Sequence, residues 1–406
     1  MGYKSRRRRA TELQEEHLLL KMKSFSLLLL VVSPLFIAVN AWQNIRDAPS
    51  TTVDIQDGQT GTLEVLPPRQ TDTGTKRVPD DDHPFIAPGP NDMRGPCPAM
   101  NTLANHGYIS RNGITTFEEI IRGTEEAFNL NRDMASNMAA VNMLTRGNPF
   151  VNKISIGAVS PFVPPLPGQI DGPETQGIAK HGRVEGDASM TRSDVHIGDN
   201  RNFNQTLWDM DLEQLAKFGD DGPDGPATVF NVQTLIELAR QNLESDQVLD
   251  PEFAIPIRRL NLVFGAPSLI MTQVFLDVFA NGTTKQATKR IISSFFMNQT
   301  FPENWFRAAA PVLGSPIPGE IAAALPEWVP GHNDENGVFV ADPQPPAPFN
   351  ISSGCANYWD VLVNAVPGTL ADVTGIFKQN VDLLNGILFN ASGCAEPIAP
   401  AGPTNV

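Results

Sequence analysis

A single cysteine between two prolines, in the run Pro96-Cys97-Pro98, is the residue best placed to do chemistry. Pro98 suits the first turn of a helix, because its φ is already helical and an N–H would be unpaired there. The N–H groups of residues 99–101 and the helix dipole would then favour a thiolate at Cys97. A thiolate so placed can bind a haem iron, and its electron density favours O–O bond cleavage. The alternative is a buried free thiol.

The cysteine count supports the choice of Cys97. The chain holds three cysteines, Cys97, Cys355 and Cys394. In a secreted chain with an odd number of cysteines, one cysteine stays a free thiol, forms a disulfide with another chain, or takes part in chemistry. We pair Cys355 with Cys394 near the C-terminus, a loop closure that would stabilise the fold by about 3–4 kcal/mol. Cys97 then remains unpaired.

A second segment, Glu185-Gly186-Asp187-Ala188-Ser189-Met190-Thr191-Arg192, is rich in oxygen ligands. Glu185 and Ser189 are four residues apart and would be neighbours on one face of a helix. A carboxylate, a backbone carbonyl and a hydroxyl together suit a hard cation such as Mg²⁺. The alternative is a capped, solvated helix start. We interpret Arg192, at the end of the segment, as a structural ion-pair residue.

Together the two segments resemble the fungal haem-thiolate peroxidases, the family of chloroperoxidase and the unspecific peroxygenases. The likeness is greatest to the longer peroxygenases, whose hallmark is Pro-Cys-Pro, then Glu-Gly-Asp, then an Arg/Glu pair. It extends over residues 83–400, including the stretch from Pro96 through His106-Gly107-Tyr108 and the sequon at Asn204. Cys355 and Cys394 fit the disulfide found near the C-terminus of the family.

The resemblance implies a site and a reaction. Cys97 would be the axial ligand of haem b, and Glu185, the Gly186 carbonyl and Ser189 would hold a Mg²⁺ that also meets a haem propionate. The family fold is a single, mostly α-helical haem-binding domain. The implied reaction uses H₂O₂ to oxygenate or oxidise a small organic substrate, or to oxidise halide.

The sequence departs from this family at the peroxide-handling acid. The longer peroxygenases carry an arginine followed seven residues later by a glutamate. Here Arg259 aligns with that arginine and would stabilise charge, whereas the glutamate position is Ala266. The alternative function is therefore a haem-binding relative with impaired peroxide activation. A third possible function is that of a secreted glycoprotein without haem.

The sequence also departs from the family in the substrate channel. The positions of the family's channel phenylalanines align with Leu130, Val184 and Leu269.

The N-terminus indicates export. Basic residues precede the apolar run 25–39, and a cleavage site with small residues follows it and ends at Ala41, as in a secretory signal peptide. The run is short for a spanning helix, although a type-II membrane anchor is the alternative. We therefore divide the chain into 1–41, an extended segment 42–82 and a peroxidase domain 83–406. Five N-glycosylation sequons follow the leader, at Asn204, Asn281, Asn298, Asn350 and Asn390.

Composition indicates a folded, acidic protein. Hydrophobic residues make up 41% of the 406 residues, and the net charge of −15 argues against nucleic acid and against an anionic membrane surface as partners.

We predict an all-α fold, in which helices hold the site and long Pro/Gly-rich loops connect the helices. Thr116 with Glu119 predicts one helix start and Asn231 another. Two further helices are expected over residues 358–366 and 370–388. We expect His106 to be a structural hydrogen-bonding residue and His181 and His196 to lie at the surface.

Overall fold

The computed structural model describes residues 63, 74–166, 177–183, 185–262, 275–313 and 328–403. The predicted leader 1–41, most of the segment 42–82, and positions Val184, Ala266 and Leu269 lie outside these residues. Within them, no helix is long and apolar enough to cross a membrane.

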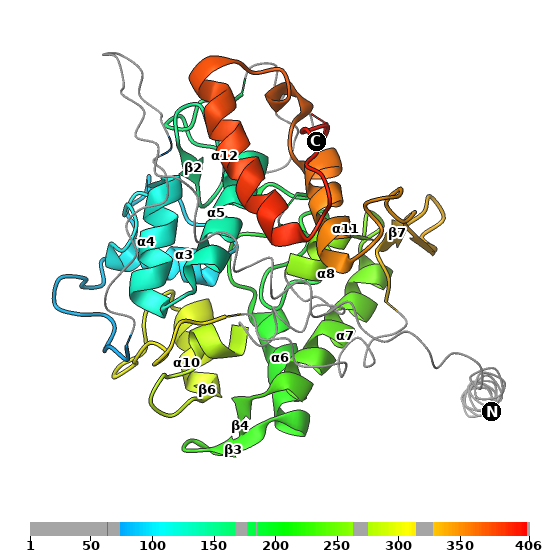
Figure 1. The fold of residues 1–406 in the computed structure, drawn as a ribbon. Helices are drawn as coiled ribbons and strands as arrows, with labels where there is room; N and C mark the ends of the chain where they lie inside the picture. Colours follow the sequence, from blue (N-terminus) through cyan, green and yellow to red (C-terminus); the bar gives the residue numbers. More distant parts are fainter. Residues whose placement is uncertain are drawn as a thin grey trace, which may run out of the picture.

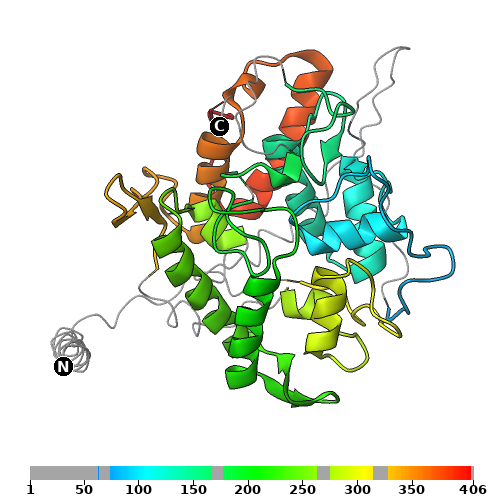
Figure 2. The same cartoon turned by 180° about the vertical axis from the view of Figure 1, so that it is seen from behind.

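The described part is mostly helical, as predicted. Helices dominate both views of the ribbon (Figures 1 and 2). The α-helices are α3 (Pro98–His106), α4 (Phe117–Phe128), α5 (Arg132–Arg146), α6 (Gln205–Phe218), α7 (Val232–Leu249), α8 (Ile257–Leu262), α10 (Lys289–Phe296), α11 (Ser353–Asp360) and α12 (Gly375–Ser392).

Short antiparallel strands join the helices, which the all-α expectation did not include. The strands are β1 (Ile114–Thr115) with β2 (Ile154–Ser155); β3 (Asp220–Gly222), β4 (Gly225–Phe230) and β6 (Ala287–Thr288) in the order 3-4-6; and β5 (Ala254–Ile255), β7 (Gly331–Asn333) and β8 (Phe339–Ala341) in the order 5-7-8. Strands of two or three residues are too short to show a two-residue hydrophobic alternation, so most of them cannot be predicted from the pattern of hydrophobic residues.

The predicted helix starts are confirmed by their caps. The Thr116 hydroxyl accepts from the Glu119 N–H at 3.2 Å at the start of α4. The Asn231 side chain accepts from the Thr234 N–H at 2.8 Å at the start of α7. In both cases a side-chain oxygen satisfies one of the N–H groups that a helix leaves unpaired.

The C-terminal helices differ in their bounds from the prediction. Helix α11 begins at Ser353, where the Ser352 hydroxyl accepts from the Cys355 N–H at 3.2 Å, and continues as a π-helix over Val361–Ala365. Helix α12 begins later than expected, at Gly375. The predicted disulfide is present between Cys355 and Cys394, with 4.9 Å between the Cα atoms. It joins the start of α11 to the chain just after α12.

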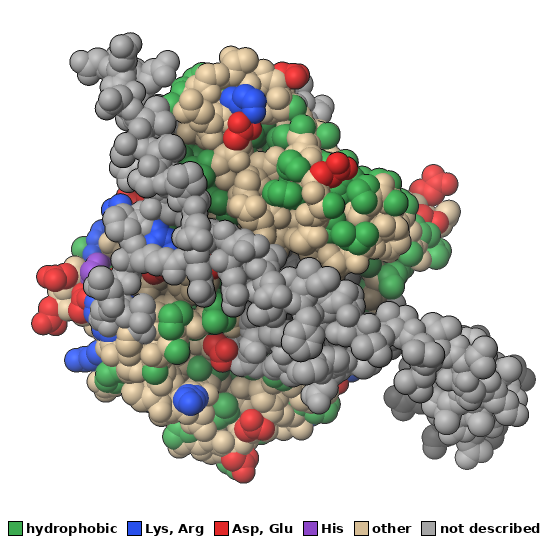
Figure 3. All heavy atoms as spheres, in the orientation of Figure 1, with side chains coloured by type: hydrophobic (Ala, Val, Ile, Leu, Met, Phe, Trp, Pro, Cys, Tyr) green, Lys and Arg blue, Asp and Glu red, His purple; other side chains and the backbone are tan. Residues whose placement is uncertain are grey.

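Two hydrophobic cores support the site. The larger one includes an aromatic cluster in which Phe128 and Phe295 each lie with ring centroids 5.5–5.9 Å from Phe301 and Trp305. A smaller core joins the 185–194 loop to α7 and β5 through Ala188, Ile236, Ala239, Leu243, Phe253 and Ile255. On the face drawn in Figure 3 the acidic side chains are spread out rather than gathered in one patch.

Candidate functional site

Cys97 lies directly before α3, as the sequence predicts. Its backbone is extended, with φ −80° and ψ 111°, and Pro98 begins the helix. The N–H groups of Ala99 and Met100 donate to the sulfur. The approach to Cys97 is fixed by Asn101, whose side chain accepts from the Gly95 N–H at 3.0 Å and donates to the Gly95 carbonyl at 2.8 Å.

The thiol of Cys97 is free, and its surroundings have opposing effects on its pKa. The side chain keeps some exposed surface, but the sulfur lies deep in the protein. Burial therefore raises the pKa of the Cys97 thiol, while the two N–H groups and the nearby Arg192 oppose that rise. Since burial dominates, these groups alone leave the thiol protonated near neutral pH, and a coordinated metal ion would be needed to hold the thiolate.

Arg192 is buried, and its hydrogen bonds go to neutral oxygen atoms. It donates to the Thr191 hydroxyl at 2.5 Å and contacts the Phe296 carbonyl at 3.5 Å. Burial lowers the pKa of Arg192 to about 10, and the charge that opposes this most is that of Cys97. The sequence offered no sign of this pairing, because Arg192 and Cys97 are distant in the chain.

The loop that carries the predicted cation ligands is not helical, so the expected helical neighbourhood of Glu185 and Ser189 is wrong. Ala188 adopts a left-handed backbone, with φ 62°, which prevents a helix from forming there. The fold nevertheless brings Ser189 and Gly186 together: the Ser189 hydroxyl donates to the Gly186 carbonyl at 3.3 Å.

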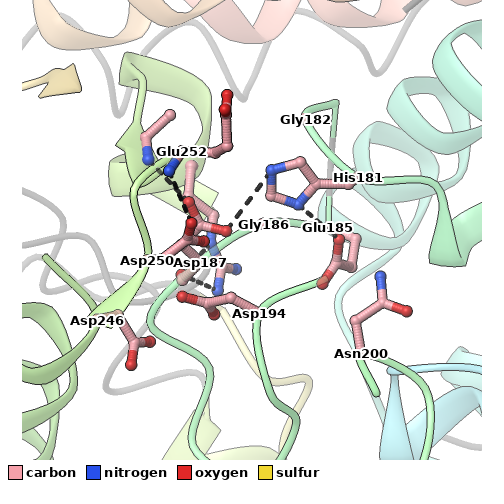
Figure 4. A network of polar contacts seen from close by, with 12 residues as sticks. His181, Gly182, Glu185, Gly186, Asp187, Asp194, Asn200, Asp246, Asp250 and Glu252 are labelled. Carbon is pink, nitrogen blue, oxygen red and sulfur yellow. Dashed lines mark hydrogen bonds and ion pairs between the residues drawn. The ribbon is translucent and has the colours of Figure 1, made fainter. Parts of the chain in front are cut away.

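Glu185 is held from the other side by a histidine. His181 Nδ1 lies 3.2 Å from Glu185 Oε2, and His181 Nε2 lies 3.5 Å from Asp187 Oδ1 (Figure 4). The surface position expected for His181 is therefore wrong, since its side chain is only 10% exposed. His196 is exposed, as predicted. Glu185 Oε1 is buried and makes no hydrogen bond within the described part of the chain, which leaves it available to a ligand.

His106 is a structural hydrogen-bonding residue, as expected. Its Nδ1 lies 2.9 Å from the His83 carbonyl and its Nε2 lies 2.9 Å from the Thr300 hydroxyl. Both ring nitrogens therefore have partners, and His106 joins the end of α3 to two other segments.

Arg259 lies against the cation loop. It donates to the Asp187 carbonyl from Nε at 2.9 Å and from Nη2 at 2.6 Å, and to the Ser189 hydroxyl at 3.0 Å. A side chain at Gly186 would meet the Arg259 Cδ at 3.1 Å. The packing therefore favours glycine at 186.

Helix α8, which carries Arg259, is held by a buried ion pair. Arg258 donates to the two carboxylate oxygens of Asp360 at 2.9 and 3.0 Å, and the Arg258 backbone N–H donates to the same carboxylate at 2.9 Å. The ion pair thereby connects α8 to the end of α11.

Buried carboxylates surround Arg259. Burial lowers the pKa of its guanidinium, and Glu185, Asp187, Asp194 and Asp246 oppose that change. Burial raises the pKa of Asp187 to about 6. Burial, reinforced by Asp187 and Asp246, raises the pKa of Asp194 to about 10. Of these aspartates only Asp187 lies in the ligand-rich segment 185–192, and none of them was predicted to be a ligand.

The predicted glycosylation sites differ in exposure. Asn298, Asn350 and Asn390 are exposed. The amide nitrogens of the partly buried Asn204 and Asn281 donate to a serine hydroxyl at 2.8 Å and to a backbone carbonyl at 3.1 Å. The exposed three are therefore the more accessible sequons.

Comparisons with known proteins agree with the two sequence motifs. Residues 83–310 match the family model described as "Peroxidase, family 2". The chain is 31% identical over 344 residues to the aromatic peroxygenase of Cyclocybe aegerita, covering 82% of this chain and 86% of the relative. It is 34% identical over 244 residues to the aromatic peroxygenase of Coprinellus radians, covering 60% and 89%. Over 39 residues it is 54% identical to the chloroperoxidase of Leptoxyphium fumago, 10% of each chain.

Proposed function

This chain belongs to peroxidase family 2, the fungal haem-thiolate peroxidases and peroxygenases, and from that premise we propose that it is a secreted peroxygenase whose haem b is bound through Cys97. It is a peroxide-using oxidoreductase, and its family supports haem as cofactor. The proposed substrates are H₂O₂ and a small organic molecule, by analogy with relatives named aromatic peroxygenases.

The observation that carries the proposal is the setting of Cys97. It is an unpaired thiol at the N-terminus of α3, and two backbone N–H groups donate to its sulfur. Those donors and the charge of Arg192 favour the thiolate that an axial ligand must provide. When bound, haem supplies the redox chemistry that activates peroxide. The chain's own contribution is to orient the sulfur through Pro98 and the Asn101 brace.

The cation ligands fit Mg²⁺ by their chemistry. Glu185 offers a buried carboxylate oxygen, Gly186 a carbonyl and Ser189 a hydroxyl, and hard cations prefer oxygen donors of these kinds. We propose that these three residues hold Mg²⁺ beside a haem propionate. His181 would orient Glu185 by its contact with the second carboxylate oxygen.

Arg259 is proposed as the charge stabiliser of the site. Its guanidinium holds the carbonyl of Asp187 and the hydroxyl of Ser189, so it also fixes the loop that supplies the cation ligands. Arginine stays protonated and can therefore offset negative charge, but it cannot act as a base.

Export is proposed from the leader and from the relatives. A signal peptide over 1–41 would deliver a domain of residues 83–406 to an oxidising environment, where the disulfide Cys355–Cys394 is stable. Glycosylation is proposed first at the exposed sequons Asn298, Asn350 and Asn390.

The experiment is oxygen transfer from labelled peroxide. The protein, expressed with haem supply, is mixed with H₂¹⁸O₂ and an aromatic substrate, and the product is analysed by mass spectrometry. We expect ¹⁸O in the product and its loss in Cys97→Ala, with the exposed Asp372→Asn as the matched control. A haem-loaded protein that neither consumes peroxide nor oxidises the substrate would contradict the proposed function.

A further inference from the structure

We propose a second divalent cation site, for Ca²⁺, formed by Asp187 from the loop that carries the proposed Mg²⁺ ligands together with Asp194 and Asp250. One carboxylate oxygen from each residue lies within 4.8 Å of those of the other two. The three side chains come from different parts of the chain, Asp250 from the end of α7, and Figure 4 shows them gathered together. The site shares no ligand with Glu185, Gly186 or Ser189.

Each aspartate is held in place through one of its two oxygens. Asp187 Oδ2 accepts from the Ala254 N–H at 2.7 Å, and Asp194 Oδ1 accepts from the Ala188 N–H at 3.1 Å. Asp250 Oδ1 accepts from the N–H of residue 252 at 2.7 Å. These bonds fix the carboxylates before any ion binds, which lowers the cost of ordering ligands around it.

The second oxygen of each aspartate is buried and needs a partner. Asp250 is fully buried, and its Oδ2 makes no hydrogen bond within the residues the structure describes. Asp187 Oδ1 lies 3.5 Å from His181 Nε2 and makes no hydrogen bond within the described residues. Asp194 Oδ2 is likewise buried and lies beside Asp246, with which it could share a proton. Burying such oxygens without a partner is costly, so they point to a ligand.

The charges favour a cation. Arg259 is the arginine that the cluster faces, and it already offsets Glu185 and Asp246 as well as Asp187 and Asp194. His181 adds positive charge only when protonated. When the four aspartates are ionised, Arg259 and a protonated His181 offset at most two of their charges, and one divalent ion would balance the rest in this buried region.

The kind of ligand favours Ca²⁺ over Mg²⁺. The three carboxylate oxygens all lie within 4.8 Å of one another, close enough to reach one ion. Ca²⁺ accepts several carboxylates in an irregular, flexible geometry, whereas Mg²⁺ needs a near-ideal octahedron and usually keeps several waters, which a buried set of three carboxylates suits less well. Further ligands would be carbonyl oxygens or water, which Ca²⁺ accepts readily.

The test is the metal content of the haem-loaded protein after exhaustive dialysis into buffer with 1 mM CaCl₂ and then into metal-free buffer. Elemental analysis should find one calcium per chain. Asp250→Asn should lose the calcium, whereas the exposed control Asp372→Asn should keep it. Calcium retained in Asp250→Asn, or none in the wild type, would overturn the proposal. The second result would mean that a proton shared by Asp194 and Asp246 neutralises the cluster.

A second measurement, on the wild-type protein, tests the site even if Asp250→Asn fails to fold. Wild-type protein is stripped of calcium with EGTA and titrated with CaCl₂ in 5 mM MgCl₂ by isothermal titration calorimetry. We expect one calcium per chain and a higher Tm in calcium than in magnesium alone. No binding heat and an unchanged Tm would refute the site. The haem absorbance, recorded on the same sample, separates this result from failure of the proposed function.

Discussion

The ion pair that holds α8 gives a stability prediction with a definite size. Arg258 and Asp360 are 11% and 5% exposed in their side chains, and three hydrogen bonds join them. In Asp360→Asn the buried guanidinium loses its counter-charge, and breaking a buried pair in this way costs about 3–5 kcal/mol. A domain of about 320 residues unfolds with an entropy of about 0.7 kcal/mol/K, so Tm should fall by about 4–7 °C.

Scanning calorimetry of the haem-loaded protein would measure this change. Asp372→Asn, an exposed carboxylate, is the matched control and should shift Tm by less than about 1 °C. Because α8 carries Arg259, the Asp360→Asn protein should also retain less haem at equal folded content. A Tm equal to that of the control would refute the reasoning, since it would mean that Asp360 does not compensate the buried charge of Arg258.

Three other predictions concern the site and its surroundings. Glu185→Gln should lose magnesium and most of its haem, as measured by elemental analysis and Soret absorbance, because a propionate charge loses its counter-ion; unchanged contents of both would remove Glu185 from the role. Burial lowers the pKa of His106, so the stability it contributes is present above about pH 6.5 and is lost as the pH falls through the lowered value. Urea unfolding between pH 7 and 4 should therefore show a smaller acid loss in His106→Asn, and equal slopes would exclude the effect. Ala266→Glu should speed the reaction with H₂O₂ by roughly 10²–10⁴-fold in stopped-flow mixing, because a carboxylate would supply the missing acid–base group; no gain would mean that the acid lies elsewhere.

The sequence predicted local features well and long-range ones poorly. Thr116, Asn231 and Pro98 begin helices where expected, because capping depends on the residue and its nearest neighbours. The disulfide Cys355–Cys394 is present as predicted, because so few pairings were available.

The part of the site that depends on tertiary contacts was not predicted. His181 was expected at the surface, yet the fold places it between Glu185, only four residues further on, and Asp187. That local spacing was a signal in the sequence, whereas the burial of His181 was not. The helical geometry assigned to Glu185 and Ser189 was wrong, because the left-handed turn at Ala188 depends on carboxylates as distant as Asp246. The electrostatic effect of Arg192 on Cys97 likewise arises only in the folded chain.

The most direct test of the proposed site is the spectrum of the reduced carbonyl complex of the haem-loaded protein. Thiolate ligation shifts its Soret band to the red, and only sulfur donation from the axial ligand does so. We expect the red-shifted band in the wild type and in Asp372→Asn, and its replacement by an ordinary histidine-type band in Cys97→His. A red-shifted band that persists in Cys97→His would show that Cys97 is not the ligand and would contradict the proposed site.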